Sequence, residues 1–78
     1  MRMYTLDKHR WRKFSDINRE FALFELVTDD NQSILDVGFS DGGVLEVSFD
    51  DKVVGLVIEW SRLQEIIEEG RKLAEQDR

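Results

Sequence analysis

The chain has 78 residues, 41% of them hydrophobic and 36% charged, with no Cys and no Pro. A chain of this length has room for one modest core, so we expect residues 1–78 to form a single folded domain. The lack of Cys excludes disulfides, thiolate metal sites and a Cys nucleophile, and it favours a cytoplasmic protein. The longest apolar run, residues 53–58, is far shorter than the roughly 20 residues of a membrane-spanning helix, so we expect no membrane anchor.

Charge is distributed unevenly along the chain, whose net charge is −6. Residues 1–19 hold six bases and two acids, whereas residues 20–78 hold five bases and fifteen acids. Either the basic arm folds back onto the acidic body and offsets its repulsion, or the body presents an acidic surface to a basic partner. The acidic balance argues against direct binding of nucleic acid, because the phosphate backbone attracts clustered cations.

The first twenty residues predict an extended lead-in followed by a helix. Residues 3–6 are expected to be a short strand or an extended segment. Apolar side chains then recur at spacings of 3, 3 and 4, with bases between them, at Trp11, Phe14, Ile17 and Phe21. This spacing is typical of an amphipathic helix. We therefore expect a basic helix over about residues 8–20, with Asp7 as its N-cap. Trp11 is expected in the core or, if the helix swings free, in an interface beside Arg10 and Arg12.

The rest of the chain predicts four strands and a second helix. Alternating apolar residues and polar turns place the strands at residues 21–28, 34–40, 44–50 and 53–60. An apolar stripe over residues 62–76 predicts a helix, whose start Ser61 and Gln64 would cap. The expected fold class is α+β: a four-stranded antiparallel meander over residues 21–60, with the N-terminal amphipathic helix and a C-terminal helix packed on the sheet.

The short turns also predict which residues face each other. Leu26 is expected opposite Leu35, and Phe24 opposite Val37, on an apolar face that the C-terminal helix covers and that ends at a buried Trp60. On the other face Glu25 is expected opposite Asp36, with Glu46 and Glu59 on the neighbouring strands. Like charges directly opposed destabilise a strand pair by roughly 0.2–1 kcal/mol. We therefore expect a compensating cation, from the basic arm or from a partner.

One segment resembles a cofactor-binding motif. Residues 34–42 read ILDVGFSDG, which is similar to the first motif of the S-adenosylmethionine-dependent methyltransferases. The resemblance implies cofactor contacts at Asp36, Gly38 and Gly42. However, Ser40 replaces the middle glycine, the following segment predicts a strand in place of a helix, and the chain is too short for a doubly wound sheet. We therefore expect no cofactor.

No set of residues has the spacing of a catalytic or metal site. His9 is the only histidine, and we expect it to be exposed at a helix start. Asp29, Asn31 and Ser33 alternate as in a calcium loop, but the central Gly and the final Glu of such a loop are missing. The carboxylates of Glu25, Asp36 and Glu46 lie on a sheet face without a pocket for Mg²⁺. We therefore expect no metal and no enzymatic activity.

These observations favour a non-enzymatic, acidic binding protein. The favoured class is an immunity protein or antitoxin that neutralises a basic toxin such as a nuclease, whose site is positively charged. The expected partner-binding residues are Glu25, Asp36, Glu46 and Glu59 on the outer sheet face, or Asp29, Asp30, Asp41, Asp50 and Asp51 in the loops. The alternatives are an assembly module that homodimerises through the outer sheet face, a phage or plasmid inhibitor that mimics DNA, and a regulator that contacts nucleic acid through its basic helix.

Overall fold

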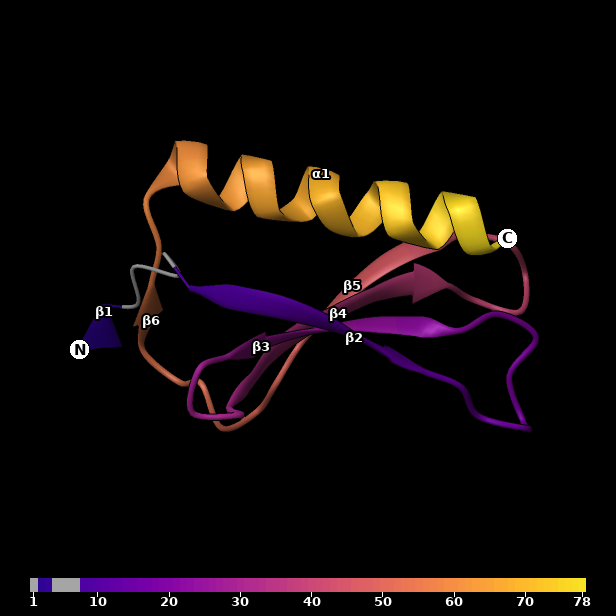
Figure 1. The fold of residues 1–78 in the computed structure, drawn as a ribbon, viewed down its shortest axis with the longest axis horizontal. Helices are drawn as coiled ribbons and strands as arrows, with labels where there is room; N and C mark the ends of the chain where they lie inside the picture. Colours follow the sequence, from indigo (N-terminus) through magenta and orange to yellow (C-terminus); the bar gives the residue numbers. More distant parts are fainter. Residues whose placement is uncertain (1, 4–7) are drawn as a thin grey trace.

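In the computed structural model, which describes residues 2–3 and 8–78, six strands precede one helix (Figure 1). The elements are β1 (Arg2–Met3), β2 (His9–Phe14), β3 (Leu23–Thr28), β4 (Ser33–Phe39), β5 (Leu45–Phe49), β6 (Leu56–Val57) and α1 (Trp60–Asp77). Met3 lies in β1, while the rest of the expected lead-in and the expected cap at Asp7 lie outside the described residues. No helix in the described part of the chain is long and apolar enough to cross a membrane.

Four of the strands form an antiparallel sheet in the order β2-β3-β4-β5, and α1 lies along one of its faces (Figure 1). The expected α+β class is therefore confirmed. The hairpin registers are confirmed as well: Leu26 faces Leu35, and Phe24 faces Val37. Across the next hairpin, Val37 faces Val47. The apolar pairs Phe24–Val37 and Leu26–Leu35 thus share one face, as the turns predicted.

The prediction of an N-terminal helix over residues 8–20 is wrong, because this segment contains β2, which pairs with β3 from His9–Thr28 to Phe14–Leu23. Residues 9–13 also alternate with the period of a strand, and Trp11 points toward α1 while Arg12 pairs with Glu25 on the other face. The spacing that suggested a helix included Ile17, which is fully exposed in the connection between β2 and β3.

The prediction of a sheet strand over residues 53–60 is also wrong. Only Leu56 and Val57 are in a strand, β6, and they pair in parallel with β1. Two consecutive turns interrupt the segment, and Gly55 has a φ of 81°, a left-handed conformation that favours glycine. The fourth strand of the sheet is therefore β2. Trp60 is not in the core: it begins α1 and is 72% exposed.

The core lies between α1 and the strands β3 and β4. Ile66, Gly70 and Ala74 are the buried positions of α1. A Cβ at Gly70 would lie 2.8 Å from Cη2 of Trp11 and from Cγ2 of Val37, so glycine permits the helix to approach the sheet closely. Trp11 packs against the core, as expected, but from a strand.

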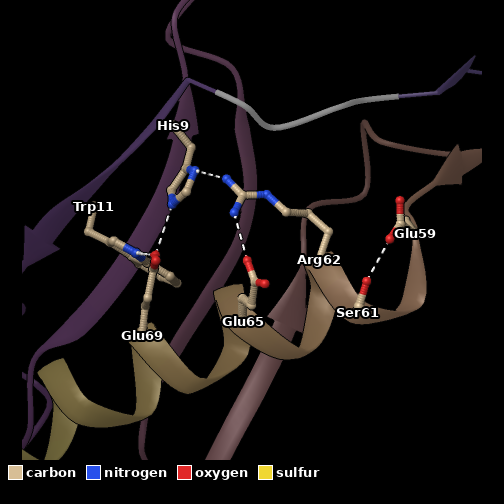
Figure 2. Close-up of polar contacts among 7 residues, drawn as sticks. All are labelled: His9, Trp11, Glu59, Ser61, Arg62, Glu65 and Glu69. Atoms are coloured by element: carbon tan, nitrogen blue, oxygen red, sulfur yellow. Dashed lines mark hydrogen bonds and ion pairs between the residues drawn. The ribbon is translucent and has the colours of Figure 1, made fainter.

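The start of α1 differs from the prediction. Glu59 occupies the N-cap position without a side-chain cap, and the Ser61 hydroxyl donates to the Glu59 carboxylate at 2.6 Å (Figure 2). The expected capping box of Ser61 and Gln64 is therefore not formed.

Candidate functional site

Four bases of the N-terminal segment are engaged within the chain. Arg12 forms an ion pair with Glu25, and Lys13 Nζ lies 2.7 Å from Asp77 Oδ1. Arg10 donates to the side chain of Asn31, and Arg19 donates to the carbonyl of Phe39 at 3.1 Å. The basic segment thus lies within and beside the sheet and compensates Glu25 directly.

A row of four side chains crosses the outer face of the sheet, the face away from α1. Arg12, Glu25, Asp36 and Ser48 follow one another across the four strands. The predicted Glu25–Asp36 opposition is confirmed. Burial raises the pKa of the Asp36 carboxyl, the Glu25 and Asp50 carboxylates raise it further, and the Arg19 guanidinium lowers it. Asp36 therefore lies in a net negative environment despite the nearby arginines.

The structure separates the nine predicted carboxylates into groups. Glu46 is exposed opposite Gly38, on the outer face that also carries Glu25 and Asp36. Glu59, which was expected on the outer sheet face, is not on the sheet, since residues 53–60 leave it. The loop carboxylates Asp29, Asp30, Asp50 and Asp51 follow β3 and β5 at one end of the sheet, and Asp41 lies at the other end.

The acidic middle of the chain has little internal compensation by cations. Residues 29–59 contain eight acids and one base, Lys52. Within the described residues, no ion pair involves any of these eight carboxylates. Asp41 accepts from the backbone of Glu20, and Asp50 from that of Lys52, at 3.0 and 2.8 Å. The negative charge of the eight carboxylates is therefore not neutralised by an ion pair within the described residues. Nor does the described part of the chain gather three or more His, Asp or Glu side chains in a way that could hold a metal.

Sequence reasoning missed an apolar hollow beside β5. Its volume is about 440 Å³, and its walls include Asp50, Asp51, Phe49, Val53, Val54, Leu56, Ile58 and Leu63. Phe49, at the end of β5, is 57% exposed. The sequence did not reveal this hollow, because residues 53–60 were expected to form a sheet strand. Gly55 was the available signal, since a glycine inside an expected strand often marks its interruption.

A polar cluster fastens β2 to α1 (Figure 2). Glu69 Oε1 lies 2.9 Å from His9 Nε2 and 3.0 Å from Trp11 Nε1, and Arg62 Nη2 lies 3.2 Å from His9 Nδ1. Because guanidinium only donates, we assign the acceptor role to Nδ1 and the proton to Nε2. The hydrogen bonds from Trp11 and His9 lower the pKa of Glu69.

The same cluster corrects the expectation of an exposed His9, whose side chain is only 11% exposed. Its two ring nitrogens are engaged by Glu69 and Arg62, which lie two turns apart on α1. We therefore assign His9 a structural role, in fixing the N-terminal strand to the helix.

The molecule thus offers an acidic outer face, an acidic sheet end and an apolar hollow, and these meet around β5. Glu46 lies within β5, and Asp50 and Asp51 follow it. Comparison with protein families, curated proteins and solved structures finds no significant match to this chain.

Proposed function

We propose that this chain is a non-enzymatic binding protein that neutralises a basic protein, as an immunity protein or antitoxin does, and that the partner is a cationic toxin such as a nuclease. The observation that carries the proposal is the uncompensated acidic segment, residues 29–59. A nuclease attracts phosphate with positive charge, so an acidic surface would speed encounter with such a site and occlude it once bound.

The side of the molecule around β5 fits this role best. Asp50 and Asp51 line the hollow that begins at Phe49, and Glu46 lies earlier in β5, on the outer face. Stable protein interfaces commonly combine an apolar centre with a polar rim. In the proposed complex the carboxylates provide attraction and orientation, and the apolar residues provide the buried contact area.

The test uses proteins encoded beside this chain in its own genome. Each is expressed alone and together with this chain, and growth and nuclease activity are measured. We expect one basic neighbour to be toxic alone and to be inhibited by one equivalent of this chain, with binding that weakens as salt rises. Failure to inhibit any cationic neighbour, or inhibition that is insensitive to salt, would contradict the proposal.

A matched pair of triple variants locates the surface. The β5 triple variant, E46Q with D50N and D51N, removes three charges from β5 and the loop after it. The α1 triple variant, E65Q with E68Q and E75Q, removes three from ion pairs on the helix. We expect the β5 triple variant to weaken binding by about tenfold or more, because these carboxylates face the partner. Equal affinities of the two variants would contradict this placement.

A further inference from the structure

One edge of the sheet, at β5, carries backbone amides and carbonyls that point away from its neighbour β4. The amide of Asp50 donates to the Ile34 carbonyl at 2.9 Å, and the amide of Ser40 donates to the Val44 carbonyl at 2.8 Å. These bonds lie at the two ends of the pairing of β4 with β5 and fix its alternation. Residues 46 and 48 therefore bond to β4. Leu45, Val47 and Phe49 direct their amides and carbonyls away from β4, toward the free edge.

The free edge of β5 is also accessible and apolar. β5 has β4 as its strand neighbour in the described part of the chain, and residues 46–49 are all exposed. Val47 and Phe49, on the α1 side of the sheet, are 37% and 57% exposed. Exposed apolar edges invite pairing with another chain, and proteins commonly blunt them with charge.

The opposite edge of the same sheet is blunted in that way. β2 reads HRWRKF and carries three cations, Arg10, Arg12 and Lys13. β5 reads LEVSF and carries one charge, at Glu46. The two edges thus differ in their protection, and among the described residues the β5 edge combines exposed apolar side chains with a continuation into a hollow.

The negative charge around the β5 edge favours a cationic segment as the added strand. Glu46 lies on the outer face of β5, Asp36 lies on the same face of β4, and Asp50 and Asp51 follow the strand. A strand added beside β5 would place alternate side chains next to Val47 and Phe49, and the others next to Glu46. The complementary sequence is therefore apolar at one set of alternate positions and cationic at the other.

We propose that the free edge of β5 binds an extended segment of the basic partner, in which apolar residues alternate with lysine or arginine, as an added strand of the sheet. An apolar side chain at one end of that segment enters the hollow beside Phe49. The inference deepens the proposed function and rests on it for the basic character of the partner. A second copy of this chain fits poorly, because antiparallel pairing of two β5 strands about Val47 sets the two Glu46 side chains diagonally on one face and joins two chains of charge −6.

The test measures amide hydrogen exchange in the full chain by NMR, with a short synthetic peptide in which lysine alternates with valine. In the free protein we expect the amides of Leu45, Val47 and Phe49 to exchange quickly. At saturating peptide these three amides should slow by about tenfold or more, because they become hydrogen-bonded. A peptide with glutamate in place of lysine should give no protection.

Two changes separate strand addition from other binding modes. Val47→Pro removes one outward amide without removing a bond to β4 and should abolish peptide binding, whereas Val47→Ala keeps the amide and should retain binding. If Val47→Pro fails to fold, a peptide methylated at its own bonding amides, added to the unchanged chain, should lose binding in the same way.

Three results would overturn the inference. If the lysine peptide shifts resonances while the three outward amides still exchange quickly, the peptide binds elsewhere. If the glutamate peptide protects these amides equally, the charge argument fails. Protection that rises with protein concentration and without peptide identifies a second copy as the occupant. Failure here with successful neutralisation of a toxin leaves the proposed function standing. Protection by the lysine peptide without any neutralised neighbour supports strand addition at β5 and contradicts the proposed function.

Discussion

Asp36 lies directly opposite Glu25 in the antiparallel pairing of β3 with β4, so two carboxylates face each other on the outer sheet face. Arg12 compensates Glu25 from β2, while Asp36 has the uncharged Ser48 on its other side. Burial of Asp36, together with the repulsion from Glu25, disfavours the ionised form of Asp36 in the folded chain. An arrangement that weakens the isolated fold but presents charge outward is consistent with a surface used for binding.

Replacing Asp36 by asparagine should stabilise the isolated protein. We expect D36N to raise the free energy of unfolding at pH 7 by about 0.5 kcal/mol, the scale of a cross-strand charge pair. Because folding raises the pKa of Asp36 above 3.8, its destabilising effect is present at neutral pH and disappears as the carboxyl is protonated. The gain should therefore vanish in urea denaturation at pH 3. Glu46→Gln, opposite Gly38, is the control and should change stability little; a D36N variant less stable than the wild type at pH 7 contradicts the account.

Replacing Gly70 by alanine should destabilise the packing of α1 on the sheet. The new Cβ would lie 2.8 Å from Trp11 and Val37 side-chain atoms. Overpacking a core costs about 1–3 kcal/mol, whereas alanine in place of glycine gains about 1 kcal/mol of helix propensity. We expect a net loss of about 1 kcal/mol in chemical denaturation. Trp11→Phe should be less harmful in the G70A background than alone, and the control Gly42→Ala, with nothing nearer than 3.7 Å, should be nearly neutral. A stabilised G70A variant would show that the helix is not held this close.

Glu69 should make the fold sensitive to acid. Hydrogen bonds from Trp11 and His9 lower its pKa in the folded state, so its contribution is present above the ordinary value of 4.5 and is lost as the pH falls through the lowered value. We expect Glu69→Gln to reduce the free energy of unfolding at pH 7 by about 0.5–1 kcal/mol, since the carboxylate is partly exposed. At pH 2.5 the variant and the wild type should be equally stable in urea denaturation. An equal loss at both pH values would assign the effect to shape rather than to charge.

The two tryptophans should differ in their contributions and their spectra. Trp60 is largely exposed, so Trp60→Gln should change stability by less than about 0.5 kcal/mol. Trp11 packs against the core and bonds to Glu69, so Trp11→Ala should cost about 2–4 kcal/mol. In single-tryptophan variants, acrylamide should quench Trp60 emission more strongly than Trp11 emission. Equal quenching would place Trp60 in the core after all.

The central hairpins and the C-terminal helix were predictable because their signals are local. The turn around Asn31, which has a φ of 63°, and the glycines before Val44 fix two registers, and apolar alternation orients them. These registers correctly placed Glu25, Asp36 and Glu46 on one face. β2 was not predictable in the same way, because its pairing with β3 spans a connection of eight residues and Trp11 and Phe14 also fit a helical spacing. The departure of residues 53–60 from the sheet depends on the left-handed conformation of Gly55 and on tertiary packing. As a result, Glu59 lies away from the sheet and the hollow is present beside Phe49.

The amide of Val47 offers the most direct test of the account, with the amide of Ser48 as an internal reference on the same strand. The backbone amide of Val47 points to the free edge, whereas the backbone of Ser48 already bonds to β4. On addition of the lysine–valine peptide, we predict that exchange at Val47 slows by about tenfold and that exchange at Ser48 changes far less. Equal slowing of both amides, or no slowing of Val47, would contradict the claim that β5 accepts a basic partner strand.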